Sequence, residues 1–150
     1  MSNPVDELAK YNVRPEAKKI TTEVVVGDIL ESSVSPLTSS MDVYEATTLL
    51  TKKGLTGLAV VDDDRNIIGF YSTRSSLKLI YNEVYNRWPR SIVRDHMIED
   101  THEVDIKTSL NDLIERYINA YFHTYPVTEN GKYVGYVVLE RVIKHLLKNK

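Results

Sequence analysis

The fold is decided by LAVVD at residues 58–62, an apolar run that ends in a polar turn and continues into IIG at 67–69. A segment that begins a helix, DVYEA at 42–46, precedes it. All three segments return in the second half of the chain as SLNDL at 109–113, YPVTE at 125–129 and YVG at 133–135. The offset is 67 residues for the first two pairs and 66 for the third, which predicts that the second copy lost one residue in the turn between its strands. The chain is therefore a tandem repeat.

Each copy predicts the order strand, helix, strand, strand, helix. In the first copy a capping box of Asp42 and Glu45 begins a helix, and Gly54 ends it because glycine tolerates the left-handed conformation. A polar turn at 63–66 then joins the two strands of a hairpin. The predicted elements are a short strand at 34–37, the helix from 42 to 54, strands at 58–62 and 67–71, and a helix at 72–86.

The second copy repeats these signals. Ser109 and Asp112 cap the first helix, and Asn130-Gly131 is typical of a tight hairpin turn. The predicted elements are a short strand at 104–106, the helix from 109, strands at 125–128 and 133–137, and a helix at 139–148.

The repeat also sets the predicted domain organisation. Residues 1–23 form a helix over 4–11 and a lead-in, 24–86 the first repeat, 87–90 a linker and 91–150 the second repeat. Units of about sixty residues are barely large enough to bury a core, so we expect the two copies to pack together about a pseudo-twofold axis. The grooves between the copies are then the natural place for a ligand.

Composition narrows the class of protein. The chain has 150 residues, 42% of them hydrophobic and 27% charged, as expected for an ordinary globular domain. Its 19 basic and 21 acidic residues give no electrostatic footprint for nucleic acid, and no apolar run is long enough for a membrane span or signal core. The absence of cysteine excludes disulfides and thiol catalysis, and we expect a cytoplasmic protein.

The order of elements, the opening VGDIL at 26–30, the Pro126-Val127 strand and the glycine-bearing hairpin before the last helix resemble a pair of cystathionine β-synthase (CBS) domains, or Bateman module. The resemblance covers about residues 24–147 and implies an α/β (α+β) fold of two tandem β-α-β-β-α repeats. It also implies homodimers and a regulatory sensor that binds AMP, ADP, ATP, S-adenosylmethionine or cyclic di-AMP between the domains.

A phosphate is best held at a helix start by backbone amides, hydroxyls and a cation, and GFYSTRS at 69–75 supplies all three. The family pattern at this corner is glycine, two residues, Ser or Thr, two residues, then Asp. Ser72 matches the hydroxyl, but Ser75 replaces the Asp that the resemblance assigns to the ribose. In the second copy Val138 replaces the hydroxyl and Arg141 replaces the Asp, although Arg141 could meet a phosphate instead.

By the same resemblance, the adenine is expected beside the loops that precede the strands at Val60 and Val127, where Ala59 replaces the usual proline. The candidate ligand-binding residues are Thr56, Gly57, Leu58, Ala59, Ser72, Thr73, Arg74, Ser75, His123, Thr124, Tyr125, Pro126 and Arg141.

Structural roles compete with ligand contact at several of these positions. Ser72 and Thr73 suit a helix cap, the two arginines suit surface ion pairs, and His123 suits a structural hydrogen bond. Six acidic and histidine residues between His96 and Asp105 have no spacing typical of a metal site, so no metal is expected. No catalytic constellation is present, and we expect a protein that is not an enzyme.

Two hypotheses follow from the sequence. In the first, the chain senses an adenine nucleotide in the cleft and changes its affinity for an unknown effector protein, with no required cofactor. In the second, it is a degenerate CBS scaffold that binds proteins without a nucleotide. Binding of cyclic di-AMP across a dimer is a further alternative.

Overall fold

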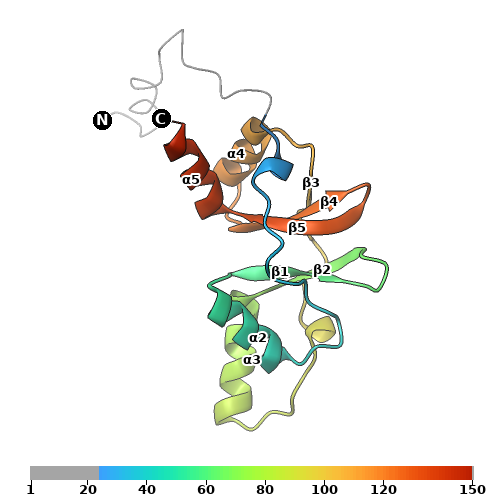
Figure 1. The fold of residues 1–150 in the computed structure, drawn as a ribbon. Coiled ribbons are helices and arrows are strands. Elements are labelled where there is room, and N and C mark those ends of the chain that lie inside the picture. Colours follow the sequence, from blue (N-terminus) through green and yellow to red (C-terminus); the bar gives the residue numbers. More distant parts are fainter. Residues whose placement is uncertain (1–23, 150) are drawn as a thin grey trace, which may run out of the picture.

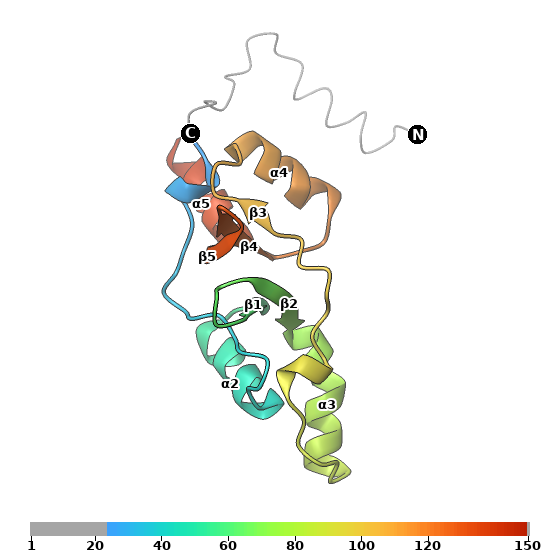
Figure 2. The ribbon, with the colours of Figure 1, turned by 90° about the vertical axis from the view of Figure 1, so that its right-hand side faces the viewer.

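Two small sheets face each other across the centre of the molecule, and the helices cover their outer sides (Figures 1 and 2). The computed structural model describes residues 24–149, so the predicted helix over 4–11 lies outside the described residues. The described elements are η1 (Val26–Asp28), α2 (Val43–Lys53), β1 (Gly57–Val61), β2 (Ile67–Ser72), α3 (Thr73–Tyr85), η2 (Val93–Asp95), β3 (Val104–Asp105), α4 (Leu110–Asn119), β4 (Thr124–Glu129), β5 (Lys132–Val138) and α5 (Leu139–Lys148).

The two hairpins share one register, which confirms the repeat. Val60 pairs with Gly69 in β1–β2, and Val127 pairs with Gly135 in β4–β5. Each hairpin has an irregularity directly after its valine, so that a residue of the second strand bulges at the same place in both copies. Beyond this bulge the first hairpin has the longer turn, and this is where the single residue is missing from the second copy.

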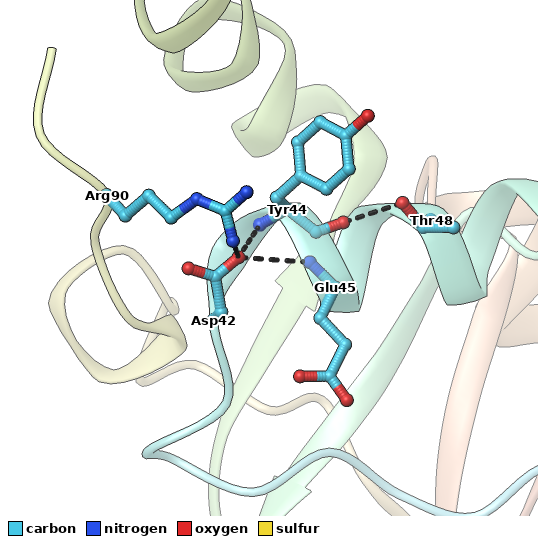
Figure 3. Close-up of polar contacts among 5 residues, drawn as sticks. All are labelled: Asp42, Tyr44, Glu45, Thr48 and Arg90. Atoms are coloured by element: carbon cyan, nitrogen blue, oxygen red, sulfur yellow. Dashed lines mark hydrogen bonds and ion pairs between the residues drawn. The ribbon is translucent and has the colours of Figure 1, made fainter.

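The helix from Asp42 begins as predicted, but only half of the predicted capping box forms. The Asp42 carboxylate accepts hydrogen bonds from the backbone N–H groups of Tyr44 at 2.8 Å and Glu45 at 3.2 Å. Figure 3 shows the Glu45 carboxylate pointing away from the Asp42 backbone. The cap carboxylate is instead met by Arg90 of the linker at 3.7 Å, whose guanidinium also lies 5.4 Å from the centre of the Tyr44 ring. At the other end Gly54 adopts the predicted left-handed conformation, with φ of 66°.

The two predicted opening strands are much shorter in the structure. In the segment 34–37 only Leu37 pairs, as an isolated parallel bridge to Val60, and Pro36 directly before it has no N–H to donate to a sheet. In the second copy β3 is limited to Val104–Asp105, parallel to β4. The first prediction was therefore wrong in calling 34–37 a regular strand, although the parallel contact has the same place in both copies.

The opening turn of each repeat packs into the other repeat. Val26 of η1 is fully buried in the core of the second repeat, and the neighbouring Gly27 N–H donates to Ile106 O at 2.9 Å. Reciprocally, Val93 of η2 is fully buried in the core of the first repeat, and its N–H donates to Met41 O at 2.9 Å. Each core is therefore completed by a segment from the other copy, so the repeats form one unit.

The residues that follow each opening turn form a crossing segment, which passes beside the second strand of a hairpin next to a glycine. Glu31 and Tyr136 exchange both backbone hydrogen bonds, at 2.7 and 2.8 Å, and Ile98 pairs in the same way with Phe70. A Cβ on Gly135 would collide with the Glu31 carbonyl oxygen and the Leu30 side chain, whereas a Cβ on Gly69 would first meet the side chain of Met97. Both glycines are thus required by a close crossing of the chain.

We expect Gly135→Ala to destabilise the protein more than Gly69→Ala. The new methyl group at 135 would meet the Glu31 backbone, which cannot move aside, whereas at 69 it would first meet the flexible Met97 side chain. The expected loss for Gly135→Ala is about 1–3 kcal/mol in the free energy of unfolding, measured by urea denaturation. An equal or smaller loss at Gly135 than at Gly69 would contradict this account of the crossing.

Candidate functional site

A cleft of about 740 Å³ opens between the two repeats, at the start of α3. It is lined by Thr56, Phe70, Ser72, Thr73, Arg74, Ser75, Leu77, Ile98, Tyr121, Phe122, His123 and Thr124. Seven of the thirteen predicted site residues lie among these, namely Thr56, Ser72, Thr73, Arg74, Ser75, His123 and Thr124. The structure therefore brings the strand-to-helix corner of the first copy and the loop before β4 to one cavity.

Hydroxyl groups line the cleft where α3 begins. Ser72 is the N-cap of α3, and its Oγ accepts from Ser75 N–H at 3.2 Å and lies 3.1 Å from Ser75 Oγ. Thr73 turns back to the floor, where its backbone N–H donates to Thr56 O at 2.9 Å. Both structural and ligand-binding roles are open to Ser72, because a hydroxyl that accepts one bond can still donate another.

The charged groups of the cleft differ in how they are engaged. Arg74 is exposed, and within residues 24–149 its guanidinium has no hydrogen-bond or ion-pair partner. His123 lies 3.6 Å from the Glu140 carboxylate, with half of its side chain exposed. Arg74 is thus the cation of this cleft that is available for an anionic ligand.

The floor of the cleft joins the two copies. Thr56, directly before β1, and Thr124, the first residue of β4, have their hydroxyl oxygens 3.4 Å apart. Both threonines line the cavity, Thr56 as an exposed residue and Thr124 as a buried one. A ligand on this floor would touch both repeats at once.

The other predicted site residues lie away from the cavity lining. Gly57, Leu58, Ala59, Tyr125 and Pro126 are buried in β1 and β4, because successive strand residues alternate between a core and the opposite sheet. Gly57 has a packing role, since a Cβ there would enter the ring of Phe70. Arg141 lies on α5 and forms an ion pair with Glu31 at 3.2 Å.

Apolar side chains complete the cleft, and none of them is among the thirteen predicted site residues. They are Phe70, Leu77, Ile98, Tyr121 and Phe122. Tyr121 is fully exposed and Phe122 is 37% exposed. Two consecutive aromatic residues in the loop before a buried strand were the available signal, because large apolar residues in a loop often face a ligand or partner.

An aromatic cluster forms the wall behind Phe122. The imidazole of His102 stacks on the Phe122 ring, with 3.7 Å between the centroids and 8° between the planes. It also packs edge-on against Phe70 and Tyr125, with ring centroids 4.8 and 5.4 Å away. Burial lowers the pKa of His102 below its ordinary value, and this effect outweighs the hydrogen bonds to the Thr124 and Asp100 carbonyls, which raise it.

On the other side of this wall lies a groove of about 800 Å³ along α4. It shares Phe122 with the cleft and is lined by His102, Lys107, Thr108, Ser109, Asp112, Glu115, Arg116, Asn119, Ala120, Phe122 and Tyr125. The acidic and histidine residues between His96 and Asp105 do not converge: within the described chain, no three such side chains are placed to hold a metal ion.

Comparison with known proteins identifies the family. The family model described as CBS domain matches residues 26–75 and again residues 93–148. The chain therefore belongs to the CBS domain family and is a pair of such domains. The helices of residues 24–149 are all too short or too polar to cross a bilayer.

Solved structures of CBS pairs share the whole fold. CBSX2 in complex with AMP is 27% identical with a TM-score of 0.72, covering 83% of this chain and 97% of that one. CBSX2 from Arabidopsis thaliana is 25% identical with a TM-score of 0.70, covering 83% and 95%. The CBS pair of MJ0100, solved with 5′-methylthioadenosine and S-adenosyl-L-methionine, is 19% identical with a TM-score of 0.68, covering 85% and 98%, and shows the fold alone.

A curated relative is the uncharacterized protein MJ1225 of Methanocaldococcus jannaschii. It is 22% identical over 121 residues, which is 81% of this chain. This chain spans only 42% of the length of that relative.

Ser72→Ala is expected to lower the free energy of unfolding by about 1 kcal/mol, because Ser75 N–H loses its cap acceptor at the start of α3. The matched control is Ser75→Ala, which keeps that bond and should change the free energy by less than about 0.5 kcal/mol. Urea denaturation of both variants measures the difference. Equal losses would assign the stabilisation to the pair of hydroxyls instead of the cap.

Proposed function

We propose that this chain is a regulatory module, not an enzyme, that binds an adenosine-containing ligand such as AMP, ADP or ATP in the cleft between its repeats. The observation that carries the proposal is the pairing of unlike surfaces in one cavity. Hydroxyls and the unpartnered Arg74 lie at the start of α3, and the apolar rings of Phe70 and Phe122 lie beside them. A nucleotide has the same two parts, an anionic phosphate and a flat base.

The phosphate would depend on side chains more than on the amides of the helix start. Two first-turn amides of α3 are already engaged, because Thr73 N–H donates to Thr56 O and Ser75 N–H donates to Ser72 Oγ. Hydroxyls and a guanidinium remain to hold the anion, and a guanidinium binds phosphate in a bidentate way. Binding of AMP by CBSX2, a relative with the same fold, supports a ligand of this class.

A degenerate scaffold that binds only proteins is the second candidate. It is favoured by Ser75, which stands where the family has an Asp for the ribose and whose hydroxyl is turned to Ser72. A dinucleotide such as cyclic di-AMP is the remaining alternative among the ligands. With a mononucleotide or a dinucleotide, the module would act by changing its contact with an effector protein, which requires that the ligand prefer one arrangement of the repeats.

We expect AMP, ADP or ATP to raise the melting temperature of the purified protein by several degrees. A ligand at about a hundred times its dissociation constant stabilises the folded state by roughly 2.7 kcal/mol. The measurement is thermal unfolding against a panel that also contains S-adenosylmethionine and cyclic di-AMP. No shift with any member would favour the scaffold.

Arg74→Ala tests the site within the same experiment. It should weaken a nucleotide at least tenfold and leave adenosine nearly unchanged, because only the phosphate contact is lost. Arg141→Ala is the matched control, since Arg141 lies on the other repeat and is paired with Glu31. If wild type and Arg74→Ala bind the nucleotide with equal affinity, the phosphate does not bind at this corner.

We also propose that the module is a homodimer and that a second copy covers the outer face of α3. Five large apolar residues, spaced along one side of this helix and its end, are at least half exposed: Leu77, Tyr81, Val84, Tyr85 and Trp88. The equivalent positions of the second repeat, Ile143 and Leu147 on α5, are exposed too, at 46% and 64%. A second copy offers the same apolar stripes in return, which suits a twofold interface.

The double variant Tyr81→Glu and Tyr85→Glu should dissociate this dimer into monomers of 17.2 kDa, because carboxylates cannot be buried in an apolar interface without a partner. Light scattering after gel filtration measures the mass. Lys78→Glu, on the same helix but outside the stripe, is the control and should remain dimeric. A wild-type protein that is monomeric at micromolar concentrations would contradict the proposal.

A further inference from the structure

His102 stands between the cleft and the groove along α4. Its ring lines the groove, and the Phe122 ring on which it stacks lines both cavities. The ring is therefore reached by solvent from the side opposite to the ligand cleft. A change at His102 would act on the cleft through Phe122 without any direct contact with the ligand.

The position of His102 is held tightly. Its Nε2 lies 3.1 Å from the Thr124 carbonyl oxygen, and its Nδ1 lies 3.4 Å from the Asp100 carbonyl oxygen. Both oxygens only accept, so the shorter contact assigns the single proton of the neutral ring to Nε2. Its backbone is in the left-handed region with φ of 40°, which is uncommon outside glycine, and its N–H donates to Asp100 Oδ1 at 3.3 Å. A residue whose strained backbone is held by its surroundings often has a functional role.

Phe122, by contrast, has two aromatic partners among residues 24–149, His102 and Tyr125. It lies in the irregular segment between α4 and β4, and its ring is 37% exposed. The other aromatic neighbour, Tyr125, meets it edge-on at 6.0 Å. The stacked His102 thus covers one face of the Phe122 ring.

We propose that His102 is a positioning residue of the ligand cleft, holding the Phe122 ring as a flat surface for the base of the ligand, and that protonation of His102 from the groove side weakens ligand binding. The inference rests on the proposed function of the cleft. An aromatic face that is fixed before the base arrives costs less ordering on binding.

Burial, not the neighbouring charges, sets the direction of the pH effect at His102. Burial among three rings favours the neutral imidazole, so its pKa is lowered. Because a charged ring packed among three aromatic rings costs desolvation, we expect protonation to loosen the stack of His102 on Phe122 towards the solvent-filled groove. The charged and titratable groups around it are Asp100 and Glu103 on its own segment, Lys107, Asp112, Glu115 and Arg116 along the groove, Tyr125 beneath the ring, and Arg74, His123 and Glu140 on the cleft side.

The sign follows from linkage. The ligand prefers the arrangement with neutral His102, so affinity is complete above the ordinary histidine pKa of about 6.5 and falls as the pH drops through the lowered pKa of the folded protein. Adenosine is the suitable probe, because it carries no phosphate whose charge would favour the imidazolium.

The experiment has two measurements. NMR of the ligand-free protein follows the His102 and Phe122 ring signals from pH 7.5 to pH 5, and calorimetry measures adenosine affinity at pH 7.5 and 5.5. The variants are His102→Asn, which tolerates the left-handed backbone but removes the ring, and His102→Phe, which keeps a ring but cannot titrate. His145→Ala on α5 is the control, and melting temperatures verify that each variant is folded.

We expect the Phe122 signals to change with the titration of His102, at a pH below 6.5. Adenosine affinity should fall at least tenfold in His102→Asn. In the wild type it should fall between pH 7.5 and 5.5 in proportion to the fraction of His102 that NMR finds protonated, while His102→Phe keeps its affinity. The proposal would be overturned by Phe122 signals that do not change with the His102 titration, by wild-type affinity in His102→Asn, or by a wild-type affinity that stays constant while His102 becomes protonated.

Failure of the proposed function has a different signature. If the wild type binds no adenosine at either pH, the cleft is not an adenosine site. The NMR titration then decides alone whether His102 positions Phe122: a shared titration keeps that role, and independent signals remove it.

Discussion

The structure depends on the exchange of the two opening turns. Val26 enters the core of the second repeat and Val93 enters the core of the first, each fully buried. Neither core is complete without a segment of the other copy, so repeats that are small on their own become one cooperative unit. A valine buried in this way removes apolar surface from water and contributes about 1.5–3 kcal/mol. The cleft exists because this exchange fixes the two sheets face to face.

The same crossing segments shape the corners where ligand chemistry is found. They pass the hairpins at Gly69 and Gly135, so closely that a Cβ would meet the Met97 side chain at Gly69 and the Glu31 backbone at Gly135. In the first copy the segment that arrives brings Ile98 to the wall of the cleft, and in the second copy the equivalent residue is Glu31. Ile98 is apolar and leaves the corner of the first copy open, while Glu31 forms an ion pair with Arg141 in the second copy. Two nearly equal repeats thus present different surfaces.

Much of the fold could be predicted from the sequence, because repeated signals are local. The helix of Asp42 begins at its cap and ends at Gly54, and the hairpin turns lie at the polar segments. The predicted opening strand at 34–37 failed, since Pro36 cannot donate to a sheet and a single bridge at Leu37 is all that forms. The candidate site could be predicted at the strand-to-helix corner, where Ser72 and Arg74 follow a glycine, since this chemistry lies within seven residues of chain.

The sequence by itself determined the duplication, the order of elements and the hydroxyls and cation at the start of α3, because capping, periodicity and spacing act over a few residues. Only the tertiary structure decided that Thr56 and Thr124 would meet on one floor and that His102 would stack on Phe122. Those contacts join residues from different copies or from separate loops. No local preference encodes them, because they arise when two sheets are packed face to face and side chains fill the space that remains.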